Sequence, residues 1–271
     1  MSKNTLLIEG HRGFPSLAPE NSLEGFRKAY QSGINGIEFD IWLTADDVIV
    51  VSHGCNRMGL DKVWDPKKEE FTFVFIPKAT YPELKQYRGA NKTDELCTLE
   101  EVFDMLGYQS SMYLNIEIKH DSDKIVEETL RMIKRKRITA KLNFCTFAHR
   151  LRPLITRWCN ELELASIPFA YNINNYELLR NEAFLKLITT EKDSVSLDIS
   201  FLLMESSDVV DFISEVKKTG GIVKTYNLMS LTELESETLY LKLVKMSIDT
   251  FICNAPDRLL EYNRKYQFNS L

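Results

Sequence analysis

Residues 37–41, Ile-Glu-Phe-Asp-Ile, form an apolar run that two carboxylates interrupt. Gly33 and Gly36 precede this run, and its alternation is typical of a strand, in which positions two apart point to the same face. Glu38 and Asp40 should therefore lie side by side. Two carboxylates this close are costly to bury unless a cation neutralises them or one of them is protonated. The alternative is that both lie on the solvated face of an edge strand.

Other polar side chains follow or interrupt further strand-like stretches. His11 and Arg12 come directly after the first stretch, and His53 ends the extension of the second. Glu117 and Lys119 interrupt a third apolar run at positions two apart, so they should share a face. A lone glutamate in a strand is usually solvated, and a lone histidine is usually an ordinary loop or core residue. Several such residues at one end of a sheet indicate a common site instead.

The residue types in this set match the chemistry of a phosphodiester. Three carboxylates without accompanying cysteines or a histidine-rich spacing favour Mg²⁺ or Ca²⁺ over zinc. Arg12 and Lys119 add fixed positive charge, and an arginine can hold a phosphate through two parallel hydrogen bonds. His11 and His53 can exchange protons near neutral pH. Cations would stabilise charge on the phosphoryl oxygens, while one imidazole activates the attacking oxygen and the other protonates the leaving one.

Strand-like and helix-like stretches alternate along the chain, which is typical of βα units on a parallel sheet. Eight such pairs fit a closed (β/α)₈ barrel, a TIM barrel, better than an open sheet. The active site of such a barrel lies at the C-terminal ends of its strands. We expect strands at residues 5–8, 36–43 with an extension at 48–52, 113–118, 142–147, 162–167, 194–199, 222–226 and 250–253. Helices are expected from 21 or 22 to 31, at 98–106, 122–134 and 151–158, within 176–187, and at 208–218, 231–245 and 255–266.

Residues 54–97 break this rhythm. The region contains several prolines and is too long for an ordinary loop. We interpret it as an insertion within a single domain that spans residues 1–271. Its apolar residues could either form a groove beside the site or make a strand that packs on the barrel: Phe71, Phe73, Val74, Phe75 and Ile76.

Composition bounds the class of protein. The net charge is −5, and the lysines and arginines are scattered, so the sequence does not indicate a basic surface that would bind nucleic acid. The first apolar run, at residues 6–8, is too short for a signal peptide or a transmembrane segment. Five widely spaced cysteines without a C-x-x-C pair favour reduced thiols. We therefore expect a soluble cytoplasmic protein, although an export route without a signal peptide stays open.

The polar residues and their surroundings resemble the glycerophosphodiester phosphodiesterase family. The ordered set His-Arg, Glu-x-Asp, His and Glu-x-Lys is specific, whereas any one piece of it would be weak. Weaker similarities occur at residues 98–102 and 253–257. The matching stretches are Gly10-His11-Arg12-Gly13, Ala18-Pro19-Glu20-Asn21, Ile37-Glu38-Phe39-Asp40, the His53 that follows Val50-Val51-Ser52, and Asn115-Ile116-Glu117-Ile118-Lys119.

This resemblance implies a TIM barrel with a small insertion after the second strand, in keeping with residues 54–97. It also implies a role for each polar residue of the set. These roles are one divalent metal bound by Glu38, Asp40 and Glu117, catalysis by His11 and His53, and a phosphate held by Arg12 and Lys119.

Some positions depart from the family pattern. Gly54 stands where an acidic residue commonly follows the second histidine, so the surroundings of that histidine should differ. Tyr226 stands where the family often carries a tryptophan that lines the substrate pocket, and Met229 replaces a usual asparagine. We expect Tyr226 to bind the substrate, and the alcohol part of that substrate stays open. Glu9 is expected to face the solvent; on the opposite face it would orient the first histidine.

These observations lead to one hypothesis. The protein would be a hydrolase that needs Mg²⁺ or Ca²⁺ and cuts small-molecule glycerophosphodiesters into glycerol phosphate and an alcohol. A cyclic phosphate intermediate stays open, as does the choice of which histidine acts as acid. One alternative is a lysophospholipase D-like hydrolase, which would need an apolar groove for an acyl chain. The other is a barrel that binds a phosphate ligand without turning it over.

Overall fold

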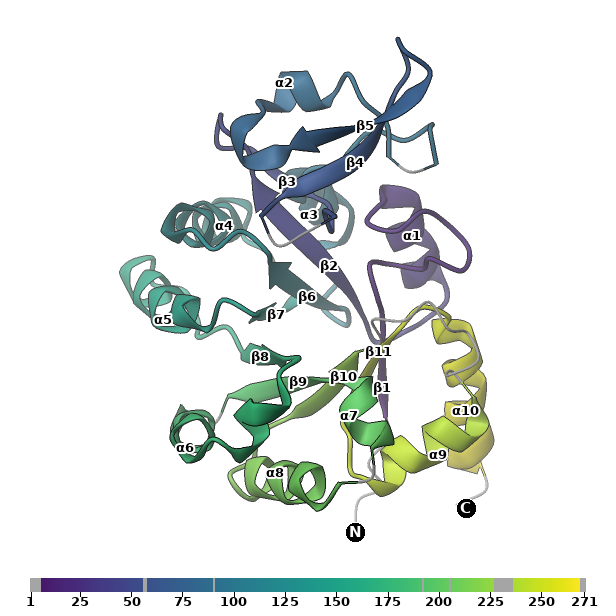
Figure 1. The fold of residues 1–271 in the computed structure, drawn as a ribbon, viewed down its shortest axis with the longest axis vertical. Coiled ribbons are helices and arrows are strands. Elements are labelled where there is room, and N and C mark those ends of the chain that lie inside the picture. The colour runs from purple at the N-terminus through teal and green to yellow at the C-terminus, as the bar shows by residue number, and fades with distance from the viewer. Residues whose placement is uncertain are drawn as a thin grey trace.

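Within the part of the chain that the structure describes, eight parallel strands close into a barrel (Figure 1). The computed structural model describes residues 6–55, 58–89, 91–191, 193–204, 206–226 and 236–268. The strands follow one another around the barrel in chain order, and the first pairs with the last to close it. They are β1 (Leu7–Gly10), β2 (Gly36–Leu43), β6 (Tyr113–Ile118), β7 (Lys141–Thr146), β8 (Phe169–Ile173), β9 (Ser194–Asp198), β10 (Val223–Tyr226) and β11 (Thr250–Cys253). The predicted TIM barrel is confirmed.

Helices cover the outside of the barrel, and several begin at caps that the sequence encodes. Ser22 accepts a hydrogen bond from the backbone of Gly25, and Thr98 forms a capping box with Glu101. None of the helices in the described residues has the length and apolar character needed to cross a bilayer. The helices are α1 (Leu23–Gln31), α3 (Leu99–Leu106), α4 (Asp123–Lys136), α5 (Arg152–Glu161), α6 (Glu182–Glu191), α7 (Ile199–Leu203), α8 (Ser207–Lys218), α9 (Glu237–Lys245) and α10 (Pro256–Phe268).

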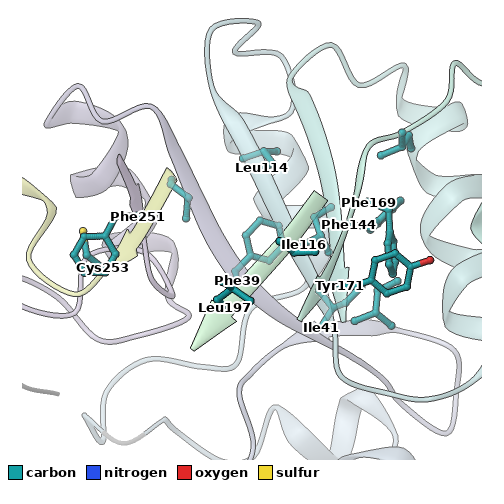
Figure 2. Packing of buried hydrophobic residues seen from close by; sticks show 14 of the residues in the cluster. Phe39, Ile41, Leu114, Ile116, Phe144, Phe169, Tyr171, Leu197, Phe251 and Cys253 are labelled. Atoms are coloured by element: carbon teal, nitrogen blue, oxygen red, sulfur yellow. The ribbon is translucent and has the colours of Figure 1, made fainter. Parts of the chain in front are cut away.

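The barrel strands are buried on both faces, so alternate residues enter two different environments. Outward-facing residues such as Phe39, Ile116 and Phe144 belong to the main hydrophobic core between strands and helices (Figure 2). Each such fully buried side chain stabilises the fold by about 1.5–3 kcal/mol. The residues between them point into the barrel, and this interior is polar. Glu38 and Asp40 of β2 are among these inward-facing residues.

One predicted strand is wrong. Residues 162–167 form a turn and a loop, and the strand lies at Phe169–Ile173 instead. The alternation in residues 162–164 imitates a strand, but Glu163 adopts a φ of 54° at the end of α5. The true strand is buried at every position, and such strands have continuous apolar runs instead of alternation. Of the helix predicted at 231–245, residues 231–235 lie outside the described residues, as does Met229.

The insertion forms a small layer beside one end of the barrel, at the top of Figure 1. Strand β3 (Ile49–Val51) runs antiparallel to β2, and the hairpin β4 (Leu60–Asp65) and β5 (Glu70–Phe75) follows, then the short helix α2 (Tyr81–Leu84). A second hydrophobic cluster of Trp42, Val50, Ile76 and Leu84 joins this layer to the barrel. The apolar residues 71–75 therefore belong to a strand, as one of the two interpretations predicted, but Phe71 and Phe73 of this strand are exposed, and of the five apolar residues Ile76 is the one in the second cluster.

None of the five cysteines, all of which the structure describes, forms a disulfide bond, and one of them is exposed. Burial raises the pKa of the Cys97 thiol to about 12, so its reactive thiolate is scarce at neutral pH. Cys55 is the exposed one.

We expect a thiol reagent at neutral pH to label one cysteine quickly in the native chain and all five after unfolding in denaturant. Cys55→Ser should abolish the fast reaction, because the other four thiols are buried. The thionitrobenzoate released over time gives the number of fast-reacting thiols in the native chain and the number of thiols in the unfolded chain. Rapid labelling of two or more native thiols would contradict the packing described here.

Candidate active site

Three carboxylates converge inside the barrel at the C-terminal ends of two neighbouring strands. Glu38 and Asp40 lie on β2, and Glu117 lies on β6, where it pairs in register with Asp40. One oxygen atom from each of the three side chains lies within 4.8 Å of the others. The side chains of Glu38, Asp40 and Glu117 are only 4%, 2% and 12% exposed. The predicted side-by-side placement is confirmed, and the solvated edge strand is ruled out.

Two cations lie against this acidic cluster. Lys119 Nζ is 2.9 Å from Glu117 Oε1 and 3.4 Å from Asp40 Oδ1. Arg12 Nε is 3.6 Å from Asp40 Oδ2, and the backbone N–H of Arg12 donates to Glu38 Oε2 at 3.0 Å. Three carboxylates thus face two cations, so the cluster would carry an excess of negative charge if all three were ionised.

The electrostatics show how the cluster behaves without a metal ion. Burial, with the charge of Asp40 added, raises the pKa of Glu38 well above its ordinary value. Burial also acts to raise the pKa of Asp40, but Lys119 and Arg12 outweigh it and lower this pKa to about 2. The raised pKa favours the protonated form of Glu38, and a bound cation would displace that proton. The buried set of oxygen donors fits Mg²⁺ or Ca²⁺.

Two imidazoles border the cluster, each with its proton placed by a hydrogen bond. The Nδ1–H of His11 donates to Oδ1 of Asn254 at 2.9 Å, and the Nδ1–H of His53 donates to the carbonyl of Gly54 at 2.8 Å. Both acceptors are oxygens that cannot donate, so each neutral ring leaves Nε2 unprotonated. The Nε2 atom of His11 lies 4.0 Å from Glu38 Oε2.

The two histidines differ in how readily they take a proton. Burial, reinforced by Arg12, lowers the pKa of His11 to about 3. Burial also lowers the pKa of His53, but the carboxylate of Asp40 acts against it. His11 is therefore neutral at physiological pH, and the carboxylate of Asp40 is the main factor that favours a proton on His53.

One cavity collects every residue that the sequence singled out for this site. Tyr226 contributes its buried ring, which stands edge-on to Phe147, and its hydroxyl donates to the carbonyl of Ile173 at 3.1 Å. The predicted residues that line this cavity are His11, Arg12, Glu38, Asp40, His53, Glu117, Lys119 and Tyr226.

Sequence reasoning missed four residues that serve this site. Asn21 donates to Asp40 Oδ2 at 2.9 Å, Asn172 donates to Glu117 Oε2 at 3.1 Å, and Asn254 orients His11. Asn21 and Asn254 lie in stretches that resemble the family, so a signal existed for both. Asn172 lies on the strand that was misplaced. The fourth residue is Ser196, whose buried hydroxyl lines the cavity and has no hydrogen-bond partner among the described residues.

Glu9 corrects another expectation. It is buried in the barrel interior, where it accepts hydrogen bonds from Lys224 Nζ at 3.1 Å and from Asn115 Nδ2 at 2.9 Å. It therefore neither faces the solvent nor orients His11. A buried cation on β10 neutralises it, and sequence distance hides this partner because 215 residues separate the two.

Fold and site together define a TIM barrel with an acidic, cation-flanked centre at the C-terminal ends of its strands. A model of the glycerophosphoryl diester phosphodiesterase family matches residues 11–258, and the chain belongs to this family. A glycerophosphodiester phosphodiesterase of Caldanaerobacter subterraneus subsp. tengcongensis is 30% identical over 269 residues, which cover 96% of this chain and 98% of that protein. One of Bacillus altitudinis is 30% identical over 169 residues, which cover 58% of this chain and 64%, just under two thirds, of that protein.

Solved structures agree with the fold. A putative glycerophosphodiester phosphodiesterase from Galdieria sulphuraria has a TM-score of 0.79 at 19% identity, covering 97% of this chain and all of that one (100%). An Oleispira antarctica phosphodiesterase, solved with the product sn-glycerol-3-phosphate, has a TM-score of 0.69 at 23% identity. The alignment covers 94% of this chain and 96% of that structure.

Proposed function

We propose that this chain, as one domain over residues 1–271, hydrolyses glycerophosphodiesters to glycerol phosphate and an alcohol. The observation that carries the proposal is the convergence of three carboxylates, two cations and two imidazoles on one cavity. The names of the relatives and the product bound to the Oleispira enzyme support the same substrate class.

The carboxylates of Glu38, Asp40 and Glu117 would hold one Mg²⁺ or Ca²⁺ ion. When bound, such an ion supplies positive charge that stabilises the phosphoryl oxygens. Arg12 and Lys119 lie beside the same carboxylates, so they are placed to bind the phosphate and to hold it in one orientation.

The histidines would divide the proton transfers. His11, which stays neutral, accepts through Nε2 the proton of the attacking oxygen as that oxygen forms its bond to phosphorus. The bond from phosphorus to the leaving alcohol breaks, and His53 donates its Nε2 proton to the alcohol oxygen from the form of the ring that carries a proton on both nitrogens. The attacking oxygen belongs to water, or to a neighbouring substrate hydroxyl. In the second case a cyclic phosphate forms, and water then opens it with the two roles reversed.

The position of His53 supports this assignment. His53 lines both the catalytic cavity and a wider cleft that runs between the barrel and the insertion, whereas His11 lines the catalytic cavity. A leaving alcohol can depart through the wider cleft, so the acid that protonates it should stand where the two spaces meet.

One structural feature favours the lysophospholipase D alternative. Phe71 and Phe73 of β5 are 39% and 58% exposed, and Phe71 lines the cleft beside His53. An acyl chain could lie against these rings.

Comparing choline release from glycerophosphocholine and from lysophosphatidylcholine, with Mg²⁺, with Ca²⁺ and with EDTA, tests the function. We expect the larger kcat/KM with glycerophosphocholine, loss of turnover in EDTA, and recovery when one of the metals is restored. A larger kcat/KM with lysophosphatidylcholine would favour the alternative. No hydrolysis of either diester with metal present would favour a barrel that only binds phosphate ligands.

A further inference from the structure

The loop that carries His53 is tied to the insertion by a chain of hydrogen bonds. The hydroxyl of Ser52 donates to Asp61 Oδ2 on β4 at 2.5 Å. The same hydroxyl oxygen accepts the backbone N–H of Gly54 at 3.1 Å. The carbonyl of Gly54 in turn accepts the Nδ1–H of His53. The imidazole is thus connected to a carboxylate of the insertion through two intervening residues.

Each link in this chain limits the next one. A serine hydroxyl has one proton, and giving it to Asp61 turns the oxygen lone pairs toward the N–H of Gly54. Gly54 has a φ of 71°, a left-handed conformation that glycine adopts without strain. The loop can therefore take this shape, but the hydrogen bonds must select it from the many that glycine allows.

A second bond from β4 fixes the peptide that receives the imidazole proton. The N–H of Cys55 belongs to the same peptide unit as the carbonyl of Gly54, and it donates to the carbonyl of Leu60 at 2.5 Å. Leu60 and Asp61 are consecutive residues of β4, so this strand holds the loop at two points. On the other side, the N–H of Ser52 donates to the carbonyl of Asp40 at 3.1 Å, which joins the loop to the acidic cluster.

We propose that Asp61 is a positioning residue for His53. By holding the hydroxyl of Ser52, it fixes the Gly54 peptide, which keeps the imidazole proton on Nδ1 and directs Nε2 into the catalytic cavity. The insertion thereby acts on turnover through the orientation of one histidine. This inference rests on the proposed function in one respect, namely that His53 donates the proton to the leaving alcohol.

Three variants distinguish the effect of losing the Ser52–Asp61 hydrogen bond from the effect of losing the charge of Asp61. Asp61→Ala and Ser52→Ala both remove the bond, whereas Asp61→Asn keeps an acceptor oxygen and loses only the charge. We expect the first two to lower kcat about tenfold or more with KM within about twofold, because misplaced catalytic groups lose rate more than binding. Asp61→Asn should keep most of the wild-type kcat.

Asp65→Ala is the matched control. Asp65 lies on the same strand and accepts the N–H of Lys67 at the hairpin turn, so its loss loosens the hairpin without touching Ser52. We expect its kcat to equal that of the wild type. The inference is overturned if Asp61→Ala keeps the wild-type kcat, if Asp65→Ala loses as much, or if Asp61→Asn is as slow as Asp61→Ala.

An NMR measurement tests the same inference without an activity assay. The chain has only four histidines, so long-range ¹H–¹⁵N spectra can report the tautomer of each ring. We expect the neutral His53 ring to be protonated on Nδ1 in the wild type and in Asp61→Asn, and to become a mixture of tautomers in Asp61→Ala and Ser52→Ala. An unchanged spectrum in both alanine variants would overturn the positioning role. Absence of diester hydrolysis by the wild type would instead overturn the proposed function.

Discussion

His53→Ala is expected to lower kcat for glycerophosphocholine hydrolysis by about 10²–10⁴-fold, the usual contribution of a general acid or base. His11→Ala should lose a similar factor. In the proposed mechanism each residue supplies one proton transfer, and the described cavity offers no further histidine that could replace either. Steady-state kinetics of the purified variants measure both losses.

The identity of the leaving group separates the two roles. A diester whose alcohol is p-nitrophenol needs little protonation when it leaves, so His53→Ala should lose much less rate with this substrate than His11→Ala. His120→Gln is the control, because His120 packs against Trp42 outside the cavity. If His53→Ala loses as much rate with the p-nitrophenyl diester as with glycerophosphocholine, the assigned acid and base roles are wrong. Near-normal turnover of either alanine variant would remove that histidine from the mechanism.

Glu38→Gln is expected to abolish metal-dependent turnover and yet leave the metal-free protein at least as stable as the wild type. The pKa of Glu38 is raised above its ordinary value of 4.5, so the folded metal-free protein binds a proton that the unfolded chain releases. Stability from this group is present below pH about 4.5 and is lost as the pH rises toward the raised pKa. Glutamine does not ionise, so the Glu38→Gln variant should not lose this stability as the pH rises.

Thermal unfolding in EDTA at pH 5 and at pH 8 measures the difference in stability between Glu38→Gln and the wild type, which should be larger at pH 8. At a hundred times Kd, added Mg²⁺ or Ca²⁺ should increase the free energy of unfolding of the wild type by about 2.7 kcal/mol and so raise its unfolding temperature. The unfolding temperature of Glu38→Gln should not change. Glu163→Gln, at a side chain that is 88% exposed, is the matched control and should change neither value. Metal-dependent turnover in Glu38→Gln would contradict the assigned role.

The sequence was sufficient to predict the parts of the site that depend on local periodicity. Alternation placed Glu38 beside Asp40, and Glu117 beside Lys119, because side chains two apart share a face of a strand. The order of strands and helices then predicted a barrel, and a barrel brings strand ends together at one face. Local pattern and one topological rule thus predicted the cluster that the structure contains.

Features that depend on distant partners could not be predicted. Lys224 neutralises Glu9 across the barrel, and Asn254 orients His11 from 243 residues away. No pattern within either stretch reveals such a partner. Gly54 indicated that the surroundings of His53 would be unusual, but the Asp61 carboxylate that accepts from Ser52 in the same loop comes from the folded hairpin.

Titrating metal-stripped protein with Mg²⁺ or Ca²⁺ in a calorimeter, and measuring glycerophosphocholine hydrolysis in the same samples, tests the central claim most directly. The buried carboxylates of Glu38, Asp40 and Glu117 should bind one ion per chain, with hydrolysis rising as that ion binds, and Glu117→Gln should lose both. Full hydrolysis by the stripped protein, with no ion bound, would contradict the account.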